Sequence, residues 1–151
     1  MAVSGRPARV VVVTEREPRH LREFPFDNLP GAGCQLALSP DGTLAACASL
    51  RHVLVARPAT GEVVRERRLA GFREERAPAL GARRQRLVCL ADGQVLWLRG
   101  QRVVDVDWEA EGLRYLPQEG LCEDIAFDHE RSRLALVNNA GRAEVWQWTP
   151  A

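Results

Sequence analysis

Short runs of apolar residues alternate with polar turns along most of this chain, and one arrangement of them recurs three times. Each copy consists of an apolar run, a polar turn and a second apolar run, over residues 36–47, 80–90 and 125–137. The residues that open the second runs, Leu44, Leu87 and Leu134, lie 43 and 47 residues apart. Apolar runs between turns predict β-strands, and the regular spacing indicates repeated copies of one supersecondary unit.

The first copy shows the plan of a four-stranded antiparallel sheet. Its pattern predicts strands at residues 34–38, 44–48, 52–56 and 63–69. The segment Ser39-Pro40-Asp41-Gly42 predicts a turn, because proline fixes one backbone dihedral and glycine accepts a positive one. Charged residues become more frequent in the last run, as expected at the outer edge of a sheet.

The second copy predicts strands at residues 79–80, 87–90, 95–98 and 102–108, the last of them outermost. Asp92-Gly93 between two apolar runs is a strong hairpin signal. In the last strand Val104 and Val106 alternate with Asp105 and Asp107, which predicts one buried side and one side in solvent.

The third copy and the amino-terminal end are incomplete. The third copy predicts strands at residues 125–127, 134–137 and 144–148, while residues 9–13 and 21–26 match the last two strands of a copy. A four-stranded unit that recurs about every 40–50 residues is typical of a β-propeller blade. We therefore predict an all-β, β-propeller-like fold of about three and a half four-stranded antiparallel blades, forming a partial or small propeller.

The length and composition fit one folded domain. The chain has 151 residues, of which 46% are apolar and 27% charged, as in ordinary globular domains. We expect an N-terminal tail at residues 1–8 and a single domain at 9–149. The domain divides into a half blade at 9–33, blades at 34–76 and 77–121, and a partial blade at 122–149.

Three sequence motifs carry a resemblance to a known family. Leu-Ser-Pro-Asp-Gly-Thr-Leu at residues 38–44, Thr-Gly-Glu at 60–62 and Glu-Val-Trp at 144–146 resemble blades of WD-repeat β-propellers, over about residues 9–149. The usual Gly-His pair is absent, with Gly71-Phe72 near its place, and Trp97-Leu98 and Trp146-Gln147 replace the usual Trp-Asp pair. The resemblance implies degenerate blades that act as a platform for peptides or protein partners, without catalytic chemistry.

The charge of the chain disfavours a nucleic-acid or membrane partner. All 21 basic residues are arginines and they face 20 acidic residues, so the formal net charge is only +1. A polyanion binder needs a net basic surface, which this balance does not supply. The only early apolar run, residues 10–13, is too short for a signal peptide or a membrane span, so we expect a cytoplasmic protein.

The sequence predicts no catalytic, metal or cofactor site. Cys34, Cys47, Cys89 and Cys122 form no close pair and have no histidine near them, so they are expected to be small buried apolar residues. His20, His52 and His129 fall in three different parts of the repeat and should not converge on a nucleophile. We therefore expect a protein that is not an enzyme.

Two loops between blades are predicted to form a partner-binding face. Both connect the outer strand of one blade to the inner strand of the next, and such loops emerge on one side of a propeller. Aromatic and arginine side chains are enriched at interface hot spots. The candidate residues in these loops are Phe72, Arg73, Arg76, Tyr115, Glu123 and Asp124. Packing of the aromatic rings between blades is the alternative for this set, as is loop capping for the two acids.

Open blade edges are the second predicted surface. The incomplete end blades leave edges that another copy or another protein must cover, and the candidate residues are Leu21, Phe24, Trp146 and Trp148. Strand alternation predicts that one of the two tryptophan rings faces outward. The sequence thus favours a non-catalytic protein–protein interaction or assembly module. A small closed propeller that binds a peptide or small ligand is the alternative, ahead of an enzyme or a nucleic-acid binder.

Overall fold

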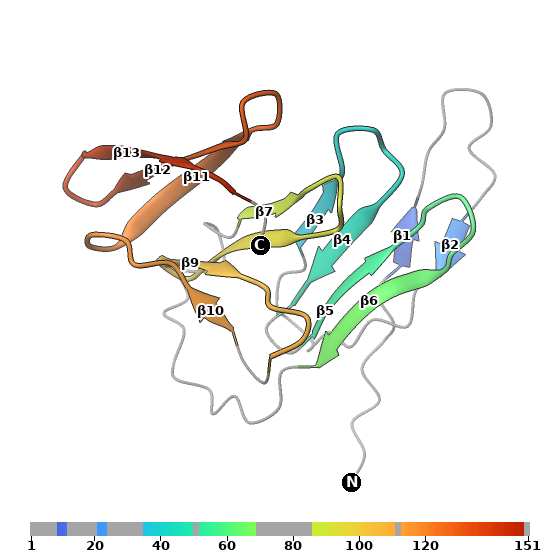
Figure 1. Ribbon diagram of the computed structural model, residues 1–151. Coiled ribbons are helices and arrows are strands. Elements are labelled where there is room, and N and C mark those ends of the chain that lie inside the picture. Colours follow the sequence, from blue (N-terminus) through green and yellow to red (C-terminus); the bar gives the residue numbers. More distant parts are fainter. Residues whose placement is uncertain are drawn as a thin grey trace, which may run out of the picture.

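Thirteen strands in four antiparallel sheets make up the described part of the chain (Figure 1). The computed structural model describes residues 9–11, 21–23, 35–49, 52–68, 86–110 and 113–149. These residues form strands and turns only, and they include no helix that is long and apolar enough to cross a membrane. The predicted all-β class is therefore confirmed.

Four sheets follow one another along the chain. A two-stranded sheet pairs β1 (Arg9–Val11) with β2 (Leu21–Glu23). Sheet I consists of β3 (Gln35–Leu38), β4 (Ala45–Ala48), β5 (His52–Ala56) and β6 (Val63–Arg68). Sheet II consists of β7 (Arg86–Cys89), β8 (Val95–Arg99), β9 (Arg102–Asp105) and β10 (Arg114–Tyr115). Sheet III consists of β11 (Cys122–Asp128), β12 (Arg133–Asn138) and β13 (Ala143–Gln147).

Within sheets I, II and III each strand pairs with the next strand in the chain. The three sheets stack face to face, with sheet II between the other two and with β1 and β2 on the far side of sheet I (Figure 1). Successive stacked meanders of three or four strands are the architecture of propeller blades. The propeller-like fold predicted from the repeat spacing is therefore confirmed, whereas the WD-repeat assignment and the blade boundaries stay predictions.

The predicted outer strand of the second blade is wrong in its extent. β9 ends at Asp105, and β10 pairs outside it through Arg114 with Asp105 and Tyr115 with Val104. The chain leaves the sheet because the Asp107 carboxylate accepts hydrogen bonds from the backbone N–H groups of Glu109 and Ala110 at 3.0 and 3.1 Å. Such an Asx turn competes with strand pairing. The strand expected at residues 79–80 lies outside the described residues.

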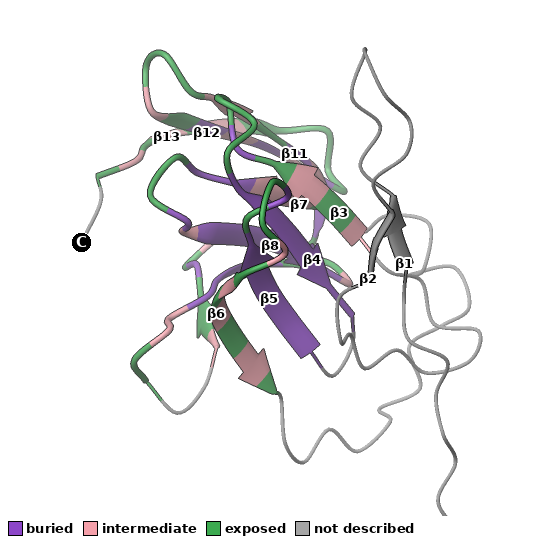
Figure 2. Ribbon diagram, turned by 90° about the vertical axis from the view of Figure 1, so that its right-hand side faces the viewer, coloured by how far each residue is buried: buried purple, intermediate pink, exposed green. Residues whose placement is uncertain are grey.

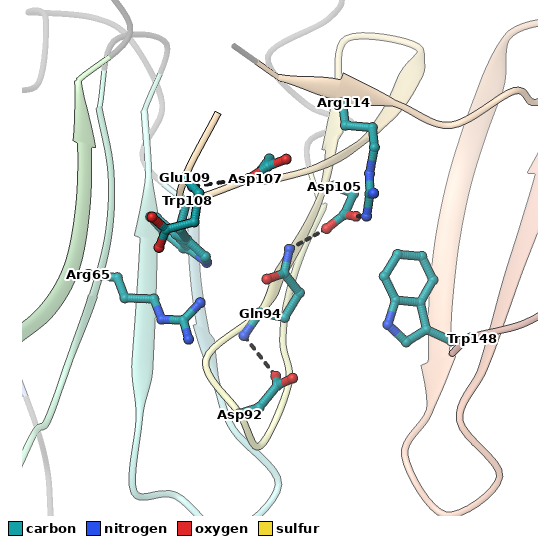
Figure 3. Close-up of a pocket in the computed structure, with 9 residues that line it drawn as sticks. All are labelled: Arg65, Asp92, Gln94, Asp105, Asp107, Trp108, Glu109, Arg114 and Trp148. Carbon is teal, nitrogen blue, oxygen red and sulfur yellow. Dashed lines mark hydrogen bonds and ion pairs between the residues drawn. The ribbon is translucent and has the colours of Figure 1, made fainter. Parts of the chain in front are cut away.

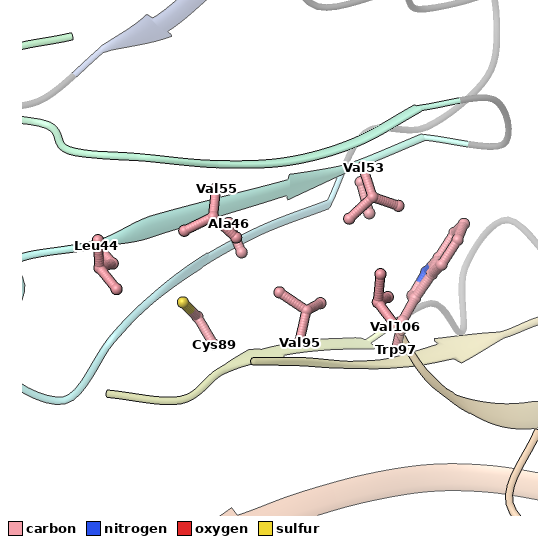
Figure 4. Close-up of a cluster of buried hydrophobic side chains, with 9 residues drawn as sticks. Leu44, Ala46, Val53, Val55, Cys89, Val95, Trp97 and Val106 are labelled. Carbon is pink, nitrogen blue, oxygen red and sulfur yellow. The ribbon is translucent and has the colours of Figure 1, made fainter. Parts of the chain in front are cut away.

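Two apolar cores hold the stack together. The first lies between sheets I and II and contains Leu44, Ala46, Ala48, Val53, Val55, Cys89, Val95, Trp97 and Val106 (Figure 4). The second lies between sheets II and III and contains Leu96, Leu98, Val103, Leu116, Cys122, Ile125, Leu134 and Leu136. Consecutive residues of β8 enter opposite cores, since side chains alternate along a strand. All five residues of β8 are therefore buried (Figure 2).

The hairpin predicted at Asp92-Gly93 is present between β7 and β8. The backbone N–H of Leu90 donates to the Gln94 carbonyl at 2.8 Å, and the N–H of Gly93 donates to the Leu90 carbonyl at 3.0 Å. Gly93 has a φ of 82°, a conformation that glycine adopts without strain. The Asp92 carboxylate accepts the N–H of Gln94 at 2.9 Å and completes the turn.

Three of the cysteines are buried, as predicted. Cys47, Cys89 and Cys122 lie inside the fold, and Cys89 and Cys122 each belong to one of the two cores. Cys34 lies outside the described residues. Burial raises the pKa of Cys89 to about 11, because desolvation disfavours the thiolate.

This shift predicts a loss of stability at alkaline pH. The Cys89 thiol is more easily ionised in the unfolded chain than in the folded one, so its contribution is fully present below about pH 9 and is lost as the pH rises towards 11. We expect a Cys89→Ala variant to lose less unfolding free energy than the wild type between these values. Denaturant unfolding at pH 8, 9, 10 and 11 measures the difference, and parallel curves would contradict the assignment.

The expectation that Trp146 or Trp148 faces outward is wrong. Both rings pack against the second core, because residues two apart on a strand share one face. Val145, which directly precedes Trp146, points to the opposite face and is 66% exposed. The exposed face of β13 thus carries the aliphatic side chain of Val145 rather than a tryptophan ring.

Candidate functional site

A cleft of about 320 Å³ opens at the end of the stack where β8 begins and β9 ends (Figure 3). All three large sheets contribute to it: Arg65 comes from β6 of sheet I, most of the lining from sheet II, and Trp148 from the residue that follows β13. The lining residues are Arg65, Asp92, Gln94, Asp105, Asp107, Trp108, Glu109, Arg114 and Trp148. Because the two apolar cores hold the three sheets against one another, the strands that carry the lining residues keep fixed relative positions.

A buried carboxylate forms the floor of the cleft. Asp105 is fully buried, and its two oxygens accept hydrogen bonds from the Gln94 side-chain amide and the Arg114 guanidinium (Figure 3). The same amide also donates to the Val106 carbonyl at 2.7 Å. The hydrogen bond to Asp105 raises the pKa of Arg114, because the carboxylate stabilises the charged guanidinium.

Further carboxylates surround this pair and make the cleft acidic. Hydrogen bonds from the backbone N–H groups of Ala110 and Glu109 lower the pKa of Asp107, which keeps it charged. Asp92 lies at the turn and Glu109 at the exposed rim. Four carboxylates thus face two guanidinium groups, those of Arg65 and Arg114. The excess of negative charge suits a cationic group.

Two indole rings lie on opposite sides of the cleft (Figure 3). Trp108 is near Arg65, whose guanidinium carbon is 5.8 Å from the ring centroid. Trp148 stands on the other side and packs against the second core. Within the described ranges the indole N–H groups of both residues have no hydrogen-bond partner. Aromatic faces beside carboxylates are favourable surroundings for a guanidinium or ammonium group.

A second feature lies beside the cleft, at the outer edge of β13. The backbone N–H of Trp148 donates to the Ser132 carbonyl at 2.7 Å, and the Arg142 carbonyl accepts the N–H of Asn138 at 2.9 Å. Residues of one strand point their backbone groups alternately to the two sides. The even-numbered residues therefore face β12, whereas Ala143, Val145 and Gln147 present N–H and C=O groups to the open edge. No strand of the described residues pairs with this edge.

Of the predicted loop residues that the structure describes, Tyr115 lies apart from Glu123 and Asp124. Tyr115 is 40% exposed on β10, with the Arg102 guanidinium carbon 4.7 Å from its ring centroid. Asp124 lies on β11 and pairs with Arg86 of β7, Oδ1 to Nε at 2.9 Å. β7 and β10 are the two edges of sheet II, which places these contacts about 14 Å apart. Glu123 is half-buried beside Asp124. Phe72, Arg73 and Arg76 lie outside the described residues.

The predicted edge residues lie in different parts of the structure. Trp148 lines the cleft, and the Trp146 indole N–H donates to the Glu144 carboxylate at 3.0 Å. Leu21 belongs to β2, whose backbone alone is described, and Phe24 lies outside the described residues. Sequence reasoning missed Gln94, Asp105, Trp108 and Arg114 as members of one cleft. It also placed Asp105 in solvent, which is wrong because sheets I and III cover both faces of sheet II.

Two of the three histidines, His52 and His129, lie in different parts of the described fold, whereas His20 lies outside the described residues. The imidazole of His52 is buried in sheet I, with Nε2 at 2.8 Å from the Glu66 carboxylate. His129 lies in the turn between β11 and β12, where its ring centroid is 5.0 Å from that of Phe127. Among the described residues no group of three or more histidine, cysteine, aspartate and glutamate side chains is arranged to hold a metal ion.

Comparison with solved structures returns proteins of low sequence identity. They include Hsv2 of Kluyvelomyces marxianus, a protein of unknown function from Bacteroides caccae, and the β-propeller domain of Cps50 (Swd1) from Myceliophteria thermophila. In that order the identities are 9%, 17% and 12% and the TM-scores are 0.48, 0.45 and 0.33. The matches cover 76%, 85% and 89% of this chain, but only 33%, 52% and 62% of those structures. No protein-family model and no curated protein sequence matches the chain.

Proposed function

We propose that this protein is a non-catalytic interaction module that accepts an extended strand of a protein partner at the outer edge of β13. The observation that carries the proposal is the row of outward-facing backbone groups on Ala143, Val145 and Gln147. An added strand would form main-chain hydrogen bonds with this row, the mode of recognition known as β-augmentation. It would also give sheet III the fourth strand that sheets I and II have.

The other outer edges are poor acceptors by comparison. β6 carries Arg65, Glu66, Arg67 and Arg68, and such charged edge strands oppose pairing with another chain. β10 is only two residues long. The three edge-facing residues of β13 are uncharged, so the deterrents found on the other sheets are missing here. This contrast favours β13 as the place where a partner strand is added.

The outer face of sheet III supports the same proposal. Ala126, Ala135, Val137 and Val145 lie on the face turned away from the second core, with Asp124, Asp128 and Arg133 around them. A strand added at β13 would extend this face and cover part of it. The proposal contains no reaction step, and the cytoplasmic location expected from the sequence stays a prediction.

A proline at Val145 tests strand addition. Val145→Pro removes an N–H that points to the open edge and leaves the bonds between β12 and β13 in place, as prolines on edge strands do. We expect peptides selected from a displayed random library against the wild type to bind the variant at least about tenfold more weakly, because their carbonyl loses its donor. Isothermal titration calorimetry measures the change.

Val145→Ala is the matched control, since it trims the side chain and retains the N–H. Its affinity for the same peptides should change by less than about threefold, equivalent to about 0.7 kcal/mol. Circular dichroism verifies that both variants keep the β-fold. Equal binding of the peptides to the proline variant and the wild type would refute strand addition at this edge.

A further inference from the structure

The outward-facing backbone groups of β13 are arranged symmetrically about Val145. Ala143 and Gln147 lie two residues to either side of it, and all three residues turn their N–H and C=O groups away from β12. An antiparallel strand of the same sequence, related by a twofold axis through Val145, presents the same groups in return. We propose that the strand accepted by β13 is β13 of a second copy of this chain. The inference rests on the strand-accepting role proposed above and names its partner.

The twofold axis fixes the register of this pairing. Val145 lies opposite Val145 of the second copy, and Ala143 lies opposite Gln147. Each of these is a hydrogen-bonded pair that exchanges two N–H···O=C bonds. The central pair joins two β-branched side chains, which are favourable cross-strand neighbours, and no like charges meet directly across the strands. The two three-stranded sheets become one continuous sheet.

The same register brings a cation to the acidic cleft. Arg142 of the second copy lies opposite Trp148, which lines the cleft. Both residues belong to the even-numbered set of β13 and its flanks, so their side chains extend to the same face of the joined sheet, the face that carries the second core. The Arg142 guanidinium therefore approaches the indole ring and the surplus carboxylates of the other copy.

Arg142 is available for this contact within one copy. Its side chain is 76% exposed, and its ion pair among the described residues is with the exposed Glu119 at 3.9 Å. Exposed pairs of this length contribute little to stability. In the cleft of the second copy the guanidinium contacts an aromatic face and charged acceptors. The twofold axis repeats this contact in the other direction, so the dimer contains it twice. Charge complementarity thus selects a second copy over an unrelated neutral strand.

Engineered disulfides test both the partner and the register. In a hydrogen-bonded antiparallel pair the Cα atoms are about 5.5 Å apart, within the range of a disulfide. We expect Val145→Cys to form a covalent dimer of twice 16.8 kDa under mild oxidation. Val64→Cys is the matched control, because Val64 is an exposed valine on the charged edge strand β6. The wild type controls for the native cysteines.

The register also predicts which pairs of different cysteine variants cross-link when they are mixed. Ala143→Cys and Gln147→Cys should each form no disulfide-linked dimer alone and should form a disulfide-linked heterodimer when mixed. If Val145→Cys forms no disulfide-linked dimer, or if Ala143→Cys cross-links to itself as readily as in the mixture, the twofold pairing is wrong. The binding of the selected peptides tests separately whether β13 accepts any strand. Peptide binding without cross-linking would therefore refute the second copy as the partner and leave the proposed strand-accepting function in place.

A charge variant tests the contact with the cleft. Arg142→Gln should raise the dissociation constant of the dimer about tenfold in sedimentation equilibrium, equivalent to about 1.4 kcal/mol. Arg131→Gln is the control, because Arg131 forms a similarly exposed ion pair with Asp128 at 3.1 Å, in the turn before β12. Equal effects of the two substitutions, or a wild type that remains monomeric at every concentration, would overturn the proposal.

Discussion

Replacement of Trp97 by alanine should destabilise the fold by about 3–5 kcal/mol, the range for truncating a large buried aromatic residue. Trp97 has the largest fully buried side chain among the described residues, and it packs in the first core against sheet I (Figure 4). Since domains of this size are stable by about 5–15 kcal/mol, the variant would retain little margin. Thermal unfolding should show a midpoint lowered by roughly 6–20 °C.

Phenylalanine at the same position should be tolerated far better. The Trp97 indole N–H is buried without a hydrogen-bond partner among the described residues, which costs about 1–3 kcal/mol in the wild type. Trp97→Phe removes this donor while keeping most of the ring, so we expect a cost below about 1.5 kcal/mol. Denaturant unfolding of both variants provides the comparison. Equal losses for the two variants would contradict this, because they would show that a feature specific to the indole, rather than the volume of the ring, determines the stability.

Removal of the Arg114 guanidinium should destabilise the fold by about 3 kcal/mol at neutral pH. Arg114→Met leaves the fully buried Asp105 carboxylate with the Gln94 amide as its remaining side-chain partner. A buried charge that loses its counterion typically costs about 3–5 kcal/mol. The lower end applies here, because the Arg114 side chain is 56% exposed and water can replace part of it. Urea unfolding at pH 7 measures the loss.

A double-mutant cycle separates the charge from the packing. Asp105→Asn keeps the shape and hydrogen-bonding capacity of the side chain and removes its charge, so this single substitution should cost about 1 kcal/mol. In the background of Asp105→Asn, the Arg114→Met substitution should then have little further effect. Additive losses in the double variant would mean that the two side chains act independently, contrary to the ion pair seen in the structure.

The strands of sheet I could be predicted closely from the sequence. The expected strand at residues 52–56 matches β5 at both ends, because a short apolar run is bounded there by turn residues. β10 could not be found in this way, since an Arg-Tyr pair contains no apolar run and its pairing with β9 depends on the intervening Asx turn at Asp107. Regular alternation thus predicts long strands, whereas a two-residue strand follows from tertiary pairing.

The cleft could not be predicted from the sequence for a related reason. Asp105 alternates with valines, which indicates a solvent-facing residue whenever one side of a sheet is wet. Sheet II has an apolar core on each side, so the carboxylate is buried and depends on Gln94 and Arg114 from two other segments. Of the residues that line the cleft, the sequence pattern indicates only Trp148 as a candidate, and it indicates a place at the blade edge rather than in the cleft.

The position of sheet II limits how far the repeats can be treated as modules. Each blade is similar in sequence plan, which suggests units that could be exchanged or removed one at a time. β8, however, contributes side chains to both cores. Loss of sheet II would therefore expose to solvent the apolar faces of sheets I and III that now pack against it. Unfolding of this part of the chain should consequently be a single cooperative event rather than a succession of independent steps. The repeats are therefore modular in their sequence plan and indivisible in their folding.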